Sequence, residues 1–113
     1  MASSHLPDPA SAVVILNASL DVDLREARAR VLHQAGYYTS SAESAEEVLH
    51  LAASLRCPIV IVCNSFSDAE RGKICAIIRA TAPTTTVILL NEFAANDPRI
   101  LVDRVKKALQ RQT

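Results

Sequence analysis

The chain has 113 residues, half of them hydrophobic, and its twelve basic and twelve acidic side chains give a formal net charge of zero. This length is typical of one domain, and the balanced charge disfavours a dedicated nucleic-acid binder, which is usually basic. No apolar run approaches the ~20 residues of a membrane-spanning helix, and the N-terminus lacks the basic region of a secretory signal. We therefore expect a cytoplasmic domain over residues 12–113, preceded by a loose tail over residues 1–11.

Metal and redox chemistry find no support in the residue spacing. The three cysteines, Cys57, Cys63 and Cys75, are odd in number and lack C-x-x-C spacing, which is typical of buried, reduced thiols. The three histidines form no i, i+4 pair, so a metal site or a general base is not indicated. We expect no metal and no cofactor.

The first part of the chain shows a strand pattern followed by a helix pattern. Ala12–Leu16 is a short apolar run that predicts a buried strand ending at Asn17. Apolar residues then recur at a helical period, and Gly36 follows as a C′ glycine that ends the helix. The expected buried stripe of this helix consists of Leu20, Leu24, Ala27, Val31 and Ala35.

The middle of the chain repeats this alternation. Tyr37–Ser41 is half polar, which is typical of a strand at a sheet edge, and Glu43–Leu55 has a helical period. Ile59–Cys63 is an apolar, β-branched run, too short for a typical helix, that predicts a strand buried on both faces at the centre of a parallel sheet. The expected inward face of the helix over residues 43–55 consists of Val48, Leu49, Ala52 and Leu55.

The last part of the chain adds two helices and one strand. Ser67 and Glu70 form a capping-box pattern that opens a helix over Asp68–Thr81. Thr85–Leu90 predicts a fourth strand, and Asp97 with Pro98 opens a final helix as N-cap and first residue. Alternating strands and helices with short loops predict a parallel sheet covered on both faces, with strand order 2-1-3-4.

These patterns resemble the receiver domain of bacterial response regulators, a CheY-like, flavodoxin-like fold. The resemblance covers about residues 12–111 and rests on the strand I-L-N, the segment T-S-S-A-E-S-A-E-E-V-L-H-L, the strand P-I-V-I-V and the final P-R-I-L-V-D-R-V-K-K-A-L. Gly72 also lies eight residues after Asn64, the spacing found in that family between the phosphoacceptor aspartate and a glycine. The resemblance implies a two-component phosphorelay signalling protein.

The family's active-site residues do not occur at the matching positions. The resemblance implies an acidic pair that binds Mg²⁺ where this chain has Asn17 and Ala18, and a phosphoacceptor aspartate where it has Asn64. It implies a switch hydroxyl where the chain has Asn91. The family's fourth helix, fifth strand and lysine have no counterpart, because only residues 92–96 separate Asn91 from the final helix.

This pattern predicts a pseudo-receiver, a non-enzymatic interaction module. An amide is not an ionised oxygen nucleophile, and Mg²⁺ prefers carboxylates and phosphate oxygens. One alternative is a receiver that accepts phosphate at another residue, such as Asp68. A second is a small flavodoxin-like ligand-binding protein or enzyme, although two glycines, Gly36 and Gly72, cannot form a glycine-rich phosphate loop.

Two groups of polar residues near the predicted strand ends allow a structural and a functional interpretation. Asn17, Asn64 and Asn91 could form a polar pocket for a neutral ligand, or could simply bond to loop backbone groups, as turn asparagines do. Asp21 and Asp23 could replace the acidic pair, but their position in a first helical turn favours an interaction with the helix dipole.

The final helix and the fourth strand predict an interaction surface. The strand over residues 85–90 becomes an apolar, uncharged sheet edge if no fifth strand follows, and such an edge favours pairing. We expect a protein partner or self-association, such as a homodimer, at this strand edge and the final helix. The simpler explanation of the basic residues of that helix is a solvated face. The basic residues of that helix are Arg99, Arg104, Lys106, Lys107 and Arg111.

Overall fold

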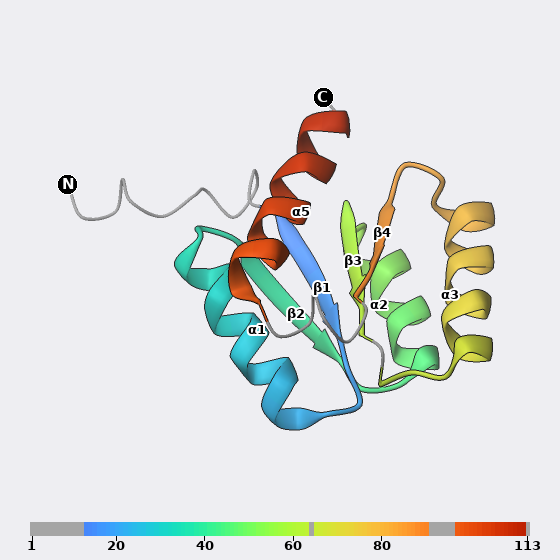
Figure 1. The fold of residues 1–113 in the computed structure, drawn as a ribbon. Coiled ribbons are helices and arrows are strands. Elements are labelled where there is room, and N and C mark those ends of the chain that lie inside the picture. Colours follow the sequence, from blue (N-terminus) through green and yellow to red (C-terminus); the bar gives the residue numbers. More distant parts are fainter. Residues whose placement is uncertain (1–12, 64, 91–96, 113) are drawn as a thin grey trace.

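A computed structural model describes residues 13–63, 65–90 and 97–112 (Figure 1). Strands and helices alternate along the chain, as predicted. The elements are β1 (Val14–Ala18), α1 (Val22–Gln34), β2 (Tyr38–Ala42), α2 (Ala45–Leu55), β3 (Ile59–Val62), α3 (Asp68–Thr81), β4 (Thr86–Leu89) and α5 (Pro98–Gln112). The predicted tail over residues 1–11 lies outside the described residues.

The four strands form one parallel sheet in the order β2-β1-β3-β4, which confirms the predicted order. β3, whose four residues are all buried, lies between β1 and β4, with Ile61 opposite Asn17 on one side and Ile88 on the other. The half-polar β2 is an edge strand, as predicted. Because every strand runs the same way, the loops that follow β1, β2 and β3 meet at the carboxyl edge of the sheet.

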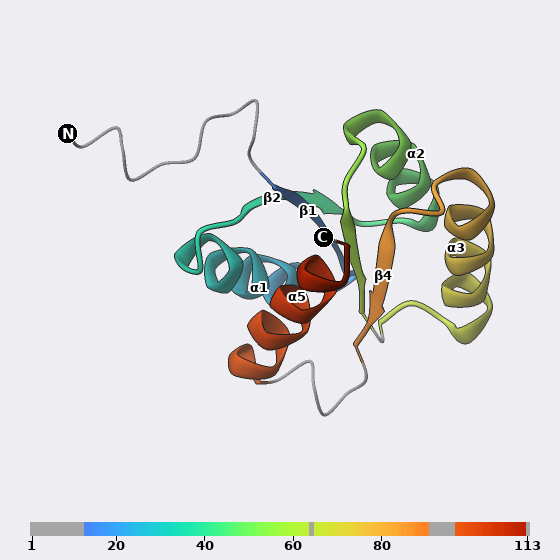
Figure 2. The same ribbon diagram turned by 90° about the horizontal axis from the view of Figure 1, so that it is seen from above.

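The helices cover both faces of the sheet in two pairs, which Figure 2 shows from above. α2 and α3 pack on one face, where Val60, Val62 and Phe66 belong to one buried cluster. α1 and α5 pack on the other, where Ile59, Ile61 and Leu101 belong to a second cluster. Successive residues of β3 therefore serve opposite cores, which explains why its sequence is an unbroken apolar run.

Several helices begin or end at the capping and glycine residues that the sequence predicts. Ser67 and Glu70 form the predicted capping box at the start of α3. Gly36, with φ of +96°, follows α1 in the left-handed conformation that glycine tolerates. Asp21, expected inside the first turn of α1, instead caps it, because its Oδ1 accepts a hydrogen bond from the Leu24 backbone N–H.

The predicted buried stripes are partly wrong. Leu20 precedes α1 and is exposed, and Leu55 at the end of α2 is exposed as well. The most buried residues of α1 are Leu32 and Arg28, of which Arg28 is only 4% exposed. A charged residue in this position departs from the usual location of arginine at the surface.

The sheet has four strands, as predicted, and the described residues contain no helix between β4 and α5. Residues 91–96, which join Leu90 to Asp97, lie outside the described residues. They number six, fewer than the dozen or so that a crossover to another parallel strand requires. None of the helices in the described segments is long and apolar enough to cross a membrane.

Candidate functional site at the carboxyl edge of the sheet

Asn17 and Ala18 are the last two residues of β1, rather than residues that follow the strand, and both are buried. The Asn17 Nδ2 atom donates a hydrogen bond of 2.8 Å to the backbone carbonyl of Arg25 in α1. Its Oδ1 atom is buried without a hydrogen-bond partner among the described residues. Asn64 and Asn91 lie outside the described residues, so the clustering of three asparagines stays a prediction.

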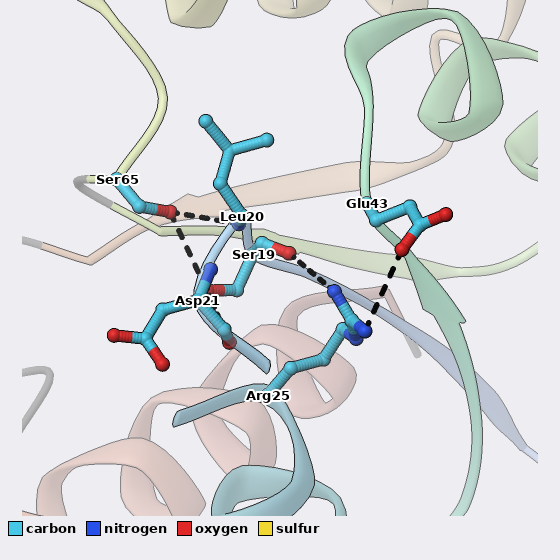
Figure 3. Close-up of polar contacts among 6 residues, drawn as sticks. All are labelled: Ser19, Leu20, Asp21, Arg25, Glu43 and Ser65. Carbon is cyan, nitrogen blue, oxygen red and sulfur yellow. Dashed lines mark hydrogen bonds and ion pairs between the residues drawn. The ribbon is translucent and has the colours of Figure 1, made fainter. Parts of the chain in front are cut away.

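Two serines connect the loop after β1 to the loop after β3 (Figure 3). The Ser65 Oγ atom accepts a hydrogen bond of 3.0 Å from the Leu20 backbone N–H and lies 3.4 Å from the Ser19 Oγ atom. Ser19, which is fully buried, also accepts a hydrogen bond from the Asp21 backbone N–H. These uncharged contacts hold the two loops together directly.

Arg25 adds the loop after β2 to this arrangement (Figure 3). Its Nη1 atom donates a hydrogen bond of 2.8 Å to the Ser19 carbonyl, and its Nη2 atom lies 3.7 Å from the Glu43 Oε2 atom. The three loops at the carboxyl edge are thus tied to one another by Ser19, Ser65 and Arg25. We refer to these three residues as the serine–arginine latch.

A second cation lies beneath the same edge, next to the end of β3. Strand alternation places Cys63 on the same sheet face as Ile61, the face that α1 covers. Burial raises the pKa of the Cys63 thiol, but hydrogen bonds from Ser65 and the neighbouring Arg28 guanidinium outweigh it, so the pKa lies below its ordinary value. The sulfur of Cys63 therefore lies in a polar, positively charged environment.

Solved structures resemble this arrangement of strands and helices, although no protein-family model and no curated protein matches the sequence. A CheY-like response regulator receiver domain protein from Methanospirillum hungatei JF-1 matches with a TM-score of 0.79 at 17% identity, over 90% of this chain and 97% of that one. Two structures of the chemotaxis regulator CheY4 of Vibrio cholerae match with TM-scores of 0.73 and 0.74 at 14% and 15% identity, each over 87% of this chain and 99% of CheY4. The fold is that of a CheY-like receiver domain.

Among the described residues, those at the end of β1 lack the carboxylates that a magnesium ion prefers. The described segments contain no group of three or more His, Cys, Asp or Glu residues that could hold a metal. Asn17, Ala18 and Ser19 carry no carboxylate. The Arg25 guanidinium bonds to the Ser19 carbonyl, and the Arg28 guanidinium neighbours Cys63. Mg²⁺ binds through carboxylates and phosphate oxygens, and nearby cations repel it.

The five basic residues predicted as a surface lie on two sides of α5. Arg99 and Lys106 line a hollow together with Val31 of α1. Arg104 points the other way, toward β4, where its Nη1 atom lies 3.3 Å from the Leu89 carbonyl oxygen. Lys107 and Arg111, three and seven residues after Arg104, share its side of the helix. The predicted surface is therefore two smaller ones.

A larger hollow of about 680 Å³ lies at the opposite, amino end of the sheet. It is bordered by the ends of α2 and α3 and by Gln112, whose Nε2 atom donates hydrogen bonds to the Pro58 and Thr84 carbonyls. It contains none of the residues predicted for a site. Gln112 therefore already bonds to the Pro58 and Thr84 carbonyls at this border of the hollow.

Sequence reasoning missed the latch and the buried arginine. Ser19 and Ser65 are common loop residues, and their pairing across 46 positions of sequence has no local signal. Arg25 and Arg28 are separated by three positions on one helix, so they share a face. This three-residue spacing indicates a polar inner side of the helix near the carboxyl end of the first strand. The prediction used only the period of the apolar residues and so did not include the two arginines.

Proposed function

We propose that this receiver-like domain is a non-enzymatic protein-interaction module of signal transduction that acts without phosphorylation. The receiver fold supports a role in signalling. The residues at its carboxyl edge support the absence of phosphoryl transfer, because Asn64 occupies the position of the acceptor aspartate in the family that the sequence resembles. Asn17 and Ala18 occupy those of the acidic pair, and Asn91 that of the switch hydroxyl.

The observation that carries this proposal is the serine–arginine latch. A phosphorylation switch needs loops that rearrange when a charged phosphoryl group arrives. Here Ser65 is bound to the Leu20 backbone and Arg25 to the Ser19 carbonyl, so the loops are joined by the protein's own groups. Such internally satisfied loops favour a single conformation and leave the surface, rather than a switch, to carry function.

Intact-mass measurement after incubation with acetyl phosphate and Mg²⁺ tests the proposal. We expect no phosphoryl adduct, because an amide at position 64 cannot act as the nucleophile. We also expect no shift of the thermal midpoint with Mg²⁺, because a ligand stabilises only a fold that binds it. A receiver domain with an intact acidic pair, treated in parallel, shows that the phosphodonor is active.

The variant Asp68→Asn serves as the control for a displaced acceptor. The Asp68 carboxylate is 94% exposed and pairs with Arg71. A stoichiometric adduct that disappears in Asp68→Asn would contradict the proposal and make the domain a receiver with a non-standard acceptor. A tightly bound small molecule in the native mass spectrum would instead favour a ligand-binding protein.

The proposed module binds its partner through α5 and the edge of β4. These elements carry the basic side chains of Arg104, Lys107 and Arg111 and the exposed Leu89 side chain. The proposal includes self-association as one form of this interaction.

A further inference from the structure

The outer edge of β4 presents backbone groups that no described strand uses, because β4 pairs with β3 alone among the described residues. The backbone N–H groups of Thr86 and Leu90 donate hydrogen bonds of 2.9 Å to carbonyls of β3 and of the residue before it. Since alternate residues of a strand point their backbone groups to opposite sides, Val87 and Leu89 direct theirs away from β3. The Leu89 carbonyl already accepts a hydrogen bond from the Arg104 Nη1 atom. This edge can therefore accept another strand through the Val87 N–H and carbonyl and through the Leu89 N–H.

The side chains beside this edge differ between the two faces of the sheet. Val87 packs on the core shared by α2 and α3, and by alternation Leu89, which is 43% exposed, lies on the same face. Ile88 faces the α5 side and is buried. An added strand would therefore find an apolar surface on the α3 side, and β4 itself carries no charge to oppose it.

On the α5 side, three cations follow the same edge. Arg104, Lys107 and Arg111 are spaced three and four residues apart, so they form a row along one side of α5. Arg104 marks where this row lies, because its guanidinium reaches the Leu89 carbonyl oxygen. The Lys107 ammonium lies 3.0 Å from the Asp103 carboxylate, which partly neutralises its charge. Arg99 and Lys106 lie on the other side of the helix, toward α1.

We propose that the edge of β4 binds an extended acidic segment of a partner protein as an additional strand. This inference rests on the proposed function and names its partner class. Backbone hydrogen bonds to the Val87 N–H and carbonyl and to the Leu89 N–H hold the segment, as in other cases where a peptide is added to a sheet edge. Its apolar side chains pack beside Leu89, and its alternate, acidic side chains face the row of Arg104, Lys107 and Arg111.

Charge and chain length disfavour the other occupants of this edge. A second copy paired antiparallel, about an axis normal to the sheet, would place two rows of cations on one face beside each other, and like charges repel. Residues 91–96 are too few for a parallel crossover. Residues 1–11 contain Pro7 and Pro9, which lack the N–H groups that a paired strand supplies.

A blocked, fluorophore-labelled octapeptide of alternating Glu and Val tests the proposal against the full chain by fluorescence anisotropy. We expect saturable binding that weakens as the salt concentration rises, and no binding of the matched Lys-Val octapeptide. Two N-methylated forms of the Glu-Val octapeptide, modified on alternate residues, should differ. Only the form that keeps the N–H groups facing β4 should bind.

Two double variants with equal charge loss locate the site on α5. Arg104→Gln with Arg111→Gln should weaken binding about 10-fold, because two exposed ion pairs are lost. Arg99→Gln with Lys106→Gln, on the opposite side of the same helix, should leave affinity unchanged within about twofold. In the variant Leu89→Pro, which removes an outward N–H, binding should be lost while circular dichroism confirms the fold.

Three results would overturn the inference: no saturable binding of the Glu-Val octapeptide at millimolar concentration, equal loss in both double variants, or a concentration-dependent dimer that Leu89→Pro abolishes. The last would assign the edge to a second copy. The intact-mass experiment decides the proposed function separately. A protein that takes up no phosphoryl group and binds no peptide loses only this inference, whereas a phosphoryl adduct contradicts the proposed function whatever the peptide does.

Discussion

Arg25 shows how one side chain can organise the loops of an α/β edge. Its guanidinium is largely buried and donates to the Ser19 carbonyl, while its contact with Glu43 is longer and involves a carboxylate that is 66% exposed. A charged donor to a backbone carbonyl, shielded from water, contributes more than a solvent-exposed ion pair. The latch therefore depends on the hydrogen bond more than on the charge of Glu43.

Variants of these two residues separate the two contacts. We expect Arg25→Met, which keeps much of the aliphatic stem, to lower the free energy of unfolding by about 1–2 kcal/mol. Glu43→Gln should lower it by less than about 0.5 kcal/mol, because an exposed ion pair contributes little. Urea denaturation measures both values. Equal losses in the two variants would show that the ion pair, rather than the carbonyl bond, holds the loops.

The ends of the helices are set by contacts of a few residues near each end. The Ser67 Oγ accepts a hydrogen bond from the Glu70 backbone N–H, and the Glu70 carboxylate accepts one from the Ser67 backbone N–H. These contacts satisfy donors that the first turn of α3 would otherwise leave free. At the other end of the chain, Gln112 fastens the last turn of α5 to Pro58, Thr84 and Thr86.

Removal of the cap at Ser67 should destabilise α3 without altering its neighbours. We expect Ser67→Ala to lower the free energy of unfolding by about 1 kcal/mol, and Ser67→Gly by only a few tenths of that. Thermal denaturation followed by circular dichroism gives both values. A loss for Ser67→Gly as large as that for Ser67→Ala would mean that the hydroxyl contributes through contacts other than the cap.

At the scale of the whole molecule, one sheet separates two apolar cores. Val60 and Val62 face α2 and α3, while Ile59 and Ile61 face α1 and α5. β3 thus takes part in both layers, and its residues are fully buried. A cavity in either core should therefore lower the free energy of unfolding of the whole domain.

Ile61→Ala tests the importance of the central strand. We expect it to lower the free energy of unfolding by about 2–5 kcal/mol, because it removes buried methylenes and leaves a cavity. Leu20→Ala serves as the matched control, since Leu20 is 46% exposed and its substitution should change stability by no more than about 0.5 kcal/mol. Comparable losses in urea denaturation would contradict the central position of β3.

Much of the fold and little of the candidate site followed from local sequence. The run Ile59–Val62, the glycine after α1 and the capping box of α3 each act over a few residues, so their effects were predictable. The burial of Arg28 and the exposure of Leu55 were not, because periodicity ranks side chains by hydrophobicity and does not show which neighbours they meet.

The sequence by itself determined the alternation of strands and helices and the parallel sheet. It also determined the uncharged character of β4 and the basic character of α5. Only the tertiary structure decided that Ser19 meets Ser65 across the sheet edge, and that Arg104 lies along β4 whereas Lys106 lies toward α1. The physical reason is distance: backbone preferences act between near neighbours, whereas these contacts arise once packing brings remote segments together.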